Sequence, residues 1–404
     1  MRRTLACLAA VTLWLAPARA ADLASVIVLS LDGVRHDLLT QGSLPSFARV
    51  VQQGARAQRL IPPFPSNTFP SHATLATGTH PDRHGILGNR FIDPERGLFD
   101  YANDASWLEA EPLWAAAERQ GVRSAVFFWV GSETDWRGRG ASLRRSPFDS
   151  SIPEAEKVDQ ILAWLDLPAA ERPRLVMAWW HGVDRAAHRH TTRSREVTRA
   201  LRAQDEQLGR LLAGLDARDA WPHTTLLLVS DHGMTPSRRR VLPQTALAEA
   251  GIAAQVVTGG GVAHIYLDDP SVAAVTAAAA ALARLPGVDA WPRAEIPARL
   301  RARHPRAGDV LAMAQPPVSF LQRRGKPLER VASWLGHRIG MHGYDPQHAD
   351  MAGVFLALGR GVPAGRALPA AHAIDVAPTV AALLGIDPPA AAEGRALFEP
   401  GALP

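Results

Sequence analysis

The chain of 404 residues contains very little cysteine and very little lysine. Its one cysteine is Cys7, so residues beyond the N-terminus cannot be joined by internal disulfides, and any metal must be held by histidine and carboxylate side chains. The lysines are Lys157 and Lys326, and nearly all of the positive charge comes from arginine. Since the formal net charge is only +5, we expect no basic groove for nucleic acid.

The apolar stretch at the N-terminus is too short to span a membrane. It covers residues 5–15, follows Arg2 and Arg3, and precedes the sequence Ala18-Arg19-Ala20-Ala21. A spanning helix needs roughly 20 apolar residues, whereas this pattern is typical of a secretory signal peptide. We therefore expect a signal peptide over residues 1–20, no transmembrane anchor after its cleavage, and a periplasmic or secreted catalytic domain over residues 21–404.

Repeats, heptads and low-complexity tracts are also absent, which excludes solenoids and coiled coils. Short aliphatic runs alternate instead with helical patterns. Buried parallel strands are expected over residues 25–31, 122–129, 174–180, 224–230 and 353–358, and helices over residues 46–53, 111–120, 154–165, 195–215 and 272–284. This alternation predicts an α/β fold with a doubly wound, mostly parallel central sheet and helices on both faces.

A segment of about residues 250–340 differs from this pattern. It is rich in alanine, arginine and proline, and strand-like pieces occur only at residues 263–267 and 309–314. We interpret the segment as a smaller insertion before His342, within one catalytic unit.

Three aspartates stand at or just after the ends of predicted strands. They are Asp32, Asp184 and Asp231. Taken singly, each would be interpreted as a helix cap or a turn residue. Because ligands gather beyond the carboxyl ends of strands in doubly wound sheets, the three together predict a polar site at that edge.

Histidines accompany two of these aspartates. His232 directly follows Asp231, and His188 lies four residues after Asp184, on the same face of a helical turn. With Asp32 and His342, these side chains supply six ligands of the kind that two divalent metal ions require.

A hydroxyl at a predicted helix start completes the set. Thr68 lies in the segment Pro65-Ser66-Asn67-Thr68-Phe69-Pro70-Ser71-His72, where backbone N–H groups attract an anion such as phosphate. A threonine hydroxyl becomes a good nucleophile only when a metal lowers its pKa. By itself, Thr68 would be interpreted as an ordinary helix cap.

The chain resembles the nucleotide pyrophosphatase/phosphodiesterase family of the alkaline phosphatase superfamily. The resemblance runs in order through nearly the whole chain beyond the N-terminus, and its motifs are Leu29 to Gly33, Asn67 to His72, Gly78 to Pro81, His84 to Ile86, Asn89, Phe128 to Glu133, Asp184 with His188, Ser230 to Met234, His342 to Tyr344 and Ile374 to Pro378.

The resemblance implies two zinc ions. One would be held by Asp184, His188 and His342, and the other by Asp32, Asp231, His232 and the nucleophile Thr68. Asn89 would donate its amide to a phosphate oxygen, and a phosphothreonine intermediate would form.

The substrate class rests on what surrounds the metals. The Lys and Arg pair that binds the extra charge of a monoester in related threonine phosphatases is not found, which favours a small phosphodiester or nucleotide. Phe69 and Trp179 are expected to bind such a substrate by stacking. Choline phosphodiesters such as glycerophosphocholine, and phosphonoacetate, stay open as alternative substrates, and a non-enzymatic binding protein is a further alternative. Nothing in the sequence indicates an oligomeric state.

Overall fold

The computed structural model describes residues 24–40, 43–321 and 338–398. The predicted signal peptide, residues 1–20, lies outside these residues. Within the described part of the chain, no helix is both long and apolar enough to cross a membrane.

An eight-stranded sheet forms the centre of the fold, in the order β19-β2-β18-β9-β1-β8-β6-β7. β1 pairs in parallel with both β8 and β9, and β6 pairs in parallel with both β7 and β8. The strands are β1 (Ser25–Leu31), β2 (Ala55–Ala57), β6 (Ser124–Phe127), β7 (Leu143–Arg145), β8 (Leu175–Trp180), β9 (Thr224–Val229), β18 (Phe355–Gly359) and β19 (Arg366–Leu368).

The expectation of a parallel strand over residues 353–358 was wrong in its direction. The strand forms as β18, but it runs antiparallel to both β9 and β2. Its residues Phe355 to Leu358 are buried, and a continuous apolar run has the same pattern in either direction. The connections of the chain set the direction. The sheet is therefore mixed, although most of its pairs are parallel as predicted.

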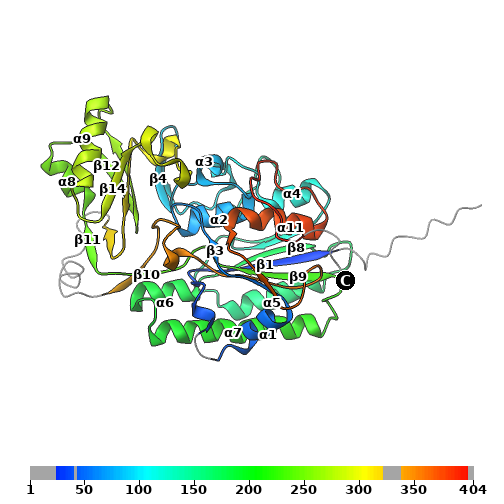
Figure 1. The fold of residues 1–404 in the computed structure, drawn as a ribbon. Coiled ribbons are helices and arrows are strands. Elements are labelled where there is room, and N and C mark those ends of the chain that lie inside the picture. The colour runs from blue at the N-terminus through cyan, green and yellow to red at the C-terminus, as the bar shows by residue number, and fades with distance from the viewer. Residues whose placement is uncertain (1–23, 41–42, 322–337, 399–404) are drawn as a thin grey trace, which may run out of the picture.

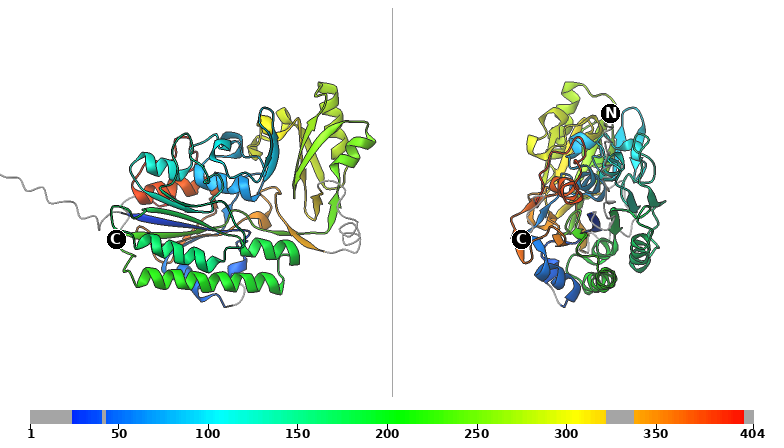
Figure 2. Two further views of the ribbon diagram at one scale, coloured as in Figure 1. Left: turned by 180° about the vertical axis from the view of Figure 1, so that it is seen from behind. Right: turned by 90° about the vertical axis from the view of Figure 1, so that its right-hand side faces the viewer.

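Helices cover both faces of this sheet, as predicted (Figures 1 and 2). One layer contains α1 (Pro45–Gln53), α5 (Glu154–Leu165), α6 (Gly182–His190) and α7 (Arg195–Asp216). The other contains α2 (Thr68–Thr77), α3 (Pro81–His84), α4 (Leu113–Arg119) and α11 (Val376–Leu384).

The alternation of side chains along β1 joins the sheet to both helical layers. Val26 and Val28 belong to the apolar cluster that includes residues of α2, α4 and α11, whereas Ile27 and Leu29 belong to the cluster that includes residues of α1, α5 and α7. Each fully buried side chain of this kind contributes about 1.5–3 kcal/mol relative to exposure. Burial on both faces makes β1 a rigid support for the loop that follows it.

Residues 243–314 form a second sheet at one end of the central one, which we call the four-stranded unit (Figure 1). Its strand order is β12-β13-β15-β14, all neighbours are antiparallel, and it has its own apolar cluster. The unit contains α8 (Pro243–Glu249), β12 (Ala254–Gly259), β13 (Val262–Leu267), α9 (Val272–Ala283), β14 (Val288–Pro292) and β15 (Val310–Ala314).

Short ribbons connect the remaining segments. They are β3 (Leu60–Ile61) with β20 (Ala371–His372), β4 (Arg90–Asp93) with β5 (Gly97–Asp100), β10 (Thr235–Ser237) with β17 (Ile339–Met341), and β11 (Arg239–Val241) with β16 (Val318–Phe320).

Arg306 joins the four-stranded unit to the main body. Its guanidinium forms an ion pair with Asp93 at 2.6 Å and donates hydrogen bonds to the carbonyl oxygens of Gly85 and Trp107 at 2.9 and 3.1 Å. Both charged side chains are almost fully buried, at 7% and 9% exposure. The segment between Gly85 and Asp93, which carries Asn89, is thereby fixed from the four-stranded unit.

We expect Arg306→Met to lower the free energy of unfolding by about 3–5 kcal/mol, because it leaves the Asp93 carboxylate buried without its partner. Urea unfolding of the two proteins measures the difference. Arg293→Met is the matched control, since Arg293 is 42% exposed and lies 3.7 Å from Asp309, so its loss should cost less than about 1 kcal/mol. Equal effects of the two substitutions would contradict the prediction.

Candidate active site

Thr68 is the first residue of α2, directly after the extended Asn67. Its hydroxyl oxygen lies 3.2 Å from His232 Nε2. As is usual in the first turn of a helix, the backbone N–H of Thr68 donates no hydrogen bond within α2 among the described residues. The start of the helix therefore carries a partial positive charge that attracts anions. A hydroxyl and a helix start that attracts anions therefore occur at the same point.

One group of metal-binding side chains surrounds Thr68. His232 Nε2 lies 3.5 Å from Asp32 Oδ1 and 3.3 Å from Asp231 Oδ2. Asp32 directly follows β1, and Asp231 and His232 follow β9, with Ser230 between, so neighbouring strands of the sheet bring the three together. All three are buried, and their ligand atoms lie close enough to one another to share one ion.

A second group lies beside the first. Asp184 Oδ1 is 3.3 Å from His188 Nε2, one helical turn further along α6, and 3.9 Å from His342 Nε2. The two imidazole nitrogens are 3.1 Å apart. The ring of His342 also stacks on that of His232 at 3.8 Å, which makes the two groups one continuous cluster.

Gly33 allows the two groups to approach each other. A Cβ on this residue would lie 3.0 Å from Asp184 Cβ, and its φ of +69° is a conformation that side chains other than glycine rarely adopt. Its N–H also donates a hydrogen bond to Asp231 Oδ1 at 3.1 Å. Replacement of Gly33 would therefore disturb a carboxylate of each group.

The donor set fits divalent cations. Asp32 Oδ1, Asp184 Oδ1 and Asp231 Oδ2 are buried without a hydrogen-bond partner in the described residues. Burial, and then the negative charges of Asp231 and Asp184, raise the pKa of Asp32 well above its usual value. Three carboxylates that each have a buried, unpaired oxygen beside imidazoles form a site that cations can complete, and this combination of nitrogen and oxygen ligands suits zinc.

The four-stranded unit positions His342. Its tight turn between β12 and β13 places the N–H of Gly261 against the carbonyl of His342 at 2.9 Å. On the other side, His342 Nδ1 lies 3.1 Å from the carbonyl of Ser66, just before the nucleophile. Because Nδ1 of His342 is held by this carbonyl, Nε2 is the ring nitrogen that can bind a cation.

Asn89 is attached directly to the start of α2. Its Oδ1 accepts a hydrogen bond from the N–H of Phe69 at 2.9 Å, which leaves the amide NH₂ as the group that can donate into the cavity. The Phe69 ring is 3% exposed and makes edge contacts with Phe99 and Tyr101.

Trp179 lies at the end of β8 with its indole directed at the metal-binding cluster. Its N–H donates to Asp32 Oδ2 at 2.9 Å, and its ring stacks on Phe148 with centroids 4.8 Å apart. The side chain is 6% exposed, so it contacts the cavity mainly through its support of Asp32 and Phe148. Trp180, by contrast, is fully buried in the core.

These side chains line a cavity of about 440 Å³. Its wall includes all of the second group, Asp32 of the first group, Thr68, Asn89, Phe69 and Trp179. Residues that the sequence reasoning missed also line it, namely Tyr101, Asn103, Phe148, Ser150, His181 and Arg185. Only His181 and Arg185 had a signal, since they flank Asp184 in the sequence, whereas the others come from irregular segments without a periodic pattern.

Comparison with known proteins identifies the scaffold. The family described as type I phosphodiesterase/nucleotide pyrophosphatase matches residues 26–345, which include every residue of the two donor groups. The chain belongs to this family. The predicted family resemblance is thereby confirmed.

Relatives in the family are longer than this chain. Human ectonucleotide pyrophosphatase/phosphodiesterase family member 1 is 33% identical over 215 residues, which cover 52% of this chain and 23% of that protein. A pyrophosphatase/phosphodiesterase of Schizosaccharomyces pombe, described as uncharacterized, is 39% identical over 221 residues, which cover 53% of this chain and 45% of that protein. The chain thus aligns with less than half of the length of these relatives.

Solved structures share the fold. Human ectonucleotide pyrophosphatase/phosphodiesterase 5 superposes with a TM-score of 0.81 at 25% identity, over 90% of this chain and 96% of that one. An inactive threonine-to-alanine variant of the murine protein, solved in complex with AMP, superposes with the same TM-score at 24% identity, over the same shares of both chains. The predicted α/β fold class is confirmed.

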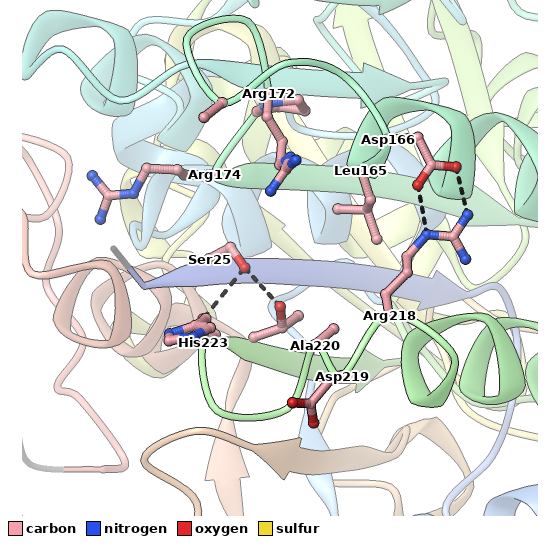
Figure 3. A pocket seen from close by; sticks show the side chains of 12 residues that line it. Ser25, Leu165, Asp166, Arg172, Arg174, Arg218, Asp219, Ala220 and His223 are labelled. Atoms are coloured by element: carbon pink, nitrogen blue, oxygen red, sulfur yellow. Dashed lines mark hydrogen bonds and ion pairs between the residues drawn. The ribbon is translucent and has the colours of Figure 1, made fainter. Parts of the chain in front are cut away.

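A second cavity, of about 370 Å³, lies at the opposite ends of the strands in this phosphodiesterase-family chain (Figure 3). Its wall includes Ser25 and Thr224, the first residues of β1 and β9. Two of its guanidinium groups already have partners within the protein, because Arg218 Nε donates to Asp166 at 2.8 Å and Arg174 donates to two backbone carbonyls. Ligand sites of doubly wound sheets lie at the other edge.

Lys157 supports the site from behind. Its side chain is fully buried in α5, and its ammonium donates to the carbonyl of Trp179 at 2.8 Å. Burial lowers the pKa of Lys157 to about 8, while the nearby Glu154 carboxylate opposes this shift. The ammonium of Lys157 is therefore a buried positive charge next to the end of β8, the strand end from which Trp179 contacts Asp32.

We expect the stability of the wild-type protein to rise with pH between about 8 and about 10.5, relative to Lys157→Met. The folded state has the lower lysine pKa, so the unfolded chain binds more protons in this window, and stability increases as pH increases. A shift of this size corresponds to about 3 kcal/mol. Urea unfolding at several pH values measures the difference, and parallel pH profiles of the two proteins would contradict it.

Proposed function

We propose that the chain is a two-zinc phosphodiesterase and pyrophosphatase that hydrolyses nucleotide-type phosphodiester or phosphoanhydride bonds through a phosphothreonine. The observation that carries the proposal is the position of the Thr68 hydroxyl. It lies at the start of α2, 3.2 Å from His232 Nε2, where two groups of metal-binding side chains meet.

The zinc ligands proposed from the sequence are retained here. Asp32, Asp231, His232 and Thr68 would hold one ion, and Asp184, His188 and His342 the other. When bound, the two ions would supply positive charge to the attacking and departing oxygens and lower the pKa of the Thr68 hydroxyl.

The residues of the chain then perform a double displacement. Asn89 donates its amide to a non-bridging oxygen and orients the phosphorus for in-line attack. Thr68 Oγ1 gives its proton to solvent and attacks phosphorus, and the P–O bond to the leaving group breaks with its electron pair on the departing oxygen. Water then attacks the phosphothreonine from the vacated side, the bond between phosphorus and Oγ1 breaks, and Oγ1 regains a proton in place of the one that the water loses, so that a phosphomonoester is released. The helix start beneath the phosphate offers its backbone dipole throughout.

The cavity wall favours a nucleotide. Two aromatic pairs contribute to it, Phe69 with Tyr101 and Phe148 with Trp179. Tyr101 is 50% exposed and Phe148 is half-buried, so both present ring surface on which a base can stack. The AMP in the murine relative agrees with this class of substrate.

Choline phosphodiesters fit less well. An aromatic surface can also bind a quaternary ammonium group. However, the wall contains the positively charged guanidinium of Arg185, which repels the quaternary ammonium group of choline. Phosphonoacetate, the other alternative, is too small to use the two aromatic pairs. A non-enzymatic binding protein would not need a nucleophile beside intact metal ligands.

We also propose that the protein acts in the periplasm or outside the cell. The proposal rests on the N-terminal sequence, which has the three parts of a secretory signal peptide. N-terminal sequencing of the protein from cell fractions tests it, and a cytoplasmic protein that retains Arg2 and Arg3 would contradict it.

We expect Thr68→Ala to lower kcat for bis(p-nitrophenyl) phosphate by at least about a thousandfold and to retain bound zinc, because six side-chain ligands remain. Turnover assays and elemental analysis of the same preparation measure both effects. His342→Ala is the matched control, and it should lose zinc and activity together. Residual activity near that of the wild type in Thr68→Ala would exclude Thr68 as the nucleophile.

A substrate panel tests the reaction class. It contains p-nitrophenyl thymidine 5′-phosphate, p-nitrophenyl phosphate, glycerophosphocholine and phosphonoacetate. A higher kcat/KM for the nucleotide ester supports the proposal. Preference for the monoester would overturn the diesterase, and preference for either of the last two would retain a hydrolase but overturn the nucleotide.

We expect Phe148→Leu to raise KM for p-nitrophenyl thymidine 5′-phosphate about tenfold, because base stacking on an aromatic ring is worth about 1–3 kcal/mol. Methyl p-nitrophenyl phosphate, which has no base, should show a much smaller change. Steady-state kinetics with both esters measure the effect. An equal rise in KM for the two esters would show that Phe148 shapes the cavity without contacting a base.

A further inference from the structure

Arg185 lies on α6, directly after the metal ligand Asp184, and its side chain lines the same cavity as Thr68 and Asn89. It is the one arginine or lysine among the described residues of the cavity wall. The side chain is exposed, and its guanidinium donates a hydrogen bond to the carbonyl of Ser150 at 2.7 Å. It also contacts the ring of His181.

The charge of Arg185 has no carboxylate partner in the described part of the chain. Several other arginines on the same helical layer form ion pairs, such as Arg210 with Asp159 and Arg218 with Asp166. Glu154, a carboxylate whose pKa the charge of Arg185 affects only slightly, uses Oε1 to accept hydrogen bonds from Gln204 and from the N–H of Gly182. Arg185 therefore presents its positive charge to the cavity.

The titratable groups around Arg185 do not neutralise its positive charge. Burial, and then the charges of Lys157 and Arg185, lower the pKa of His181 to about 4, so its ring is neutral near pH 7. Lys157 does not itself line the cavity, and its ammonium donates to the carbonyl of Trp179. A guanidinium in such a position offers several N–H donors to a phosphate, in a planar arrangement that suits two oxygens at once.

The position of Arg185 assigns it to one side of the reaction. An in-line displacement places the departing oxygen opposite Thr68 Oγ1. In the proposed function the ion that Asp184, His188 and His342 would hold supplies positive charge to that oxygen, and Arg185 directly follows Asp184 in α6 and lines the same cavity. Its guanidinium therefore adds positive charge to the cavity wall that contains this group.

We propose that Arg185 binds an anionic phosphate of the leaving group, so that the site prefers nucleoside polyphosphates over esters with an uncharged second substituent. The proposal rests on the proposed function and narrows its substrate class. A purely structural role is the alternative, since the hydrogen bond to Ser150 connects α6 to the loop that carries Phe148.

A pair of substrates with the same nucleoside half separates these roles. Thymidine 5′-triphosphate releases pyrophosphate, whereas p-nitrophenyl thymidine 5′-phosphate releases p-nitrophenol, and both yield thymidine monophosphate. We expect Arg185→Gln to lower kcat/KM for the triphosphate about tenfold and to change kcat/KM for the ester less than about twofold. The effect on the triphosphate should weaken as salt screens the charge.

Arg189→Gln is the matched control, because Arg189 is exposed one turn further along α6 and does not line the cavity. It should leave both substrates unaffected. Inhibition by pyrophosphate provides a binding measurement, and its inhibition constant should rise about tenfold in Arg185→Gln alone.

The possible failures are distinguishable. If the wild-type protein turns over neither substrate, the proposed function itself is wrong. If the wild type is active and Arg185→Gln lowers both substrates equally, the residue is structural and the inference is overturned. An unchanged triphosphate rate together with an unchanged pyrophosphate inhibition constant would overturn it as well.

Discussion

The convergence of three aspartate carboxylates, each with a buried unpaired oxygen, is the constraint around which the site is organised. Asp32, Asp184 and Asp231 converge where β1, β8 and β9 end, and each has an oxygen without a hydrogen-bond partner in the described residues. Such a cluster is unfavourable in a protein interior unless cations or protons neutralise it. Three histidines at 3.1–3.9 Å from these carboxylates or from one another provide the remaining ligands. Thr68, Asn89 and Trp179 line the same cavity as this cluster, and we interpret their positions by their contacts around it.

Rigidity of the surrounding scaffold follows from the same constraint. Like charges must be kept together against their repulsion, so the strands that carry them are buried on both faces and the glycine at position 33 allows the two groups to approach closely. The four-stranded unit contributes from outside. It fixes His342 through Gly261 and fixes the segment of Asn89 through Arg306, so that a separate sheet supports two side chains of the cavity wall.

Periodic patterns made much of this arrangement predictable from the sequence. Buried strands such as β1, β8 and β9 and amphipathic helices such as α5 and α7 lie within a few residues of their expected bounds, because local hydrophobic periodicity determines them. The direction of β18 was not predictable, since its apolar run has no direction. The two groups of metal ligands could be proposed because each stands beside a strand end or within a family motif.

The aromatic and cationic wall of the cavity could not be found in the same way. Tyr101 and Phe148 come from segments after β5 and β7 whose path depends on tertiary contacts, and their neighbours in space are distant in sequence. Arg185 was visible beside Asp184, but only the structure shows that its charge has no carboxylate partner in the described residues and lines the cavity. Substrate preference therefore depends on the least periodic parts of the chain.

The contact between Ser66 and His342 spans 276 positions of the chain. A ribosome that has completed β1, α2 and even the whole four-stranded unit has still not produced His342, nor the carbonyl of Gly340 that lies 3.0 Å from His188 Nδ1. The cluster of carboxylates and imidazoles therefore cannot assemble on a polypeptide that ends before residue 342. All of its side chains are present only after His342 has been added.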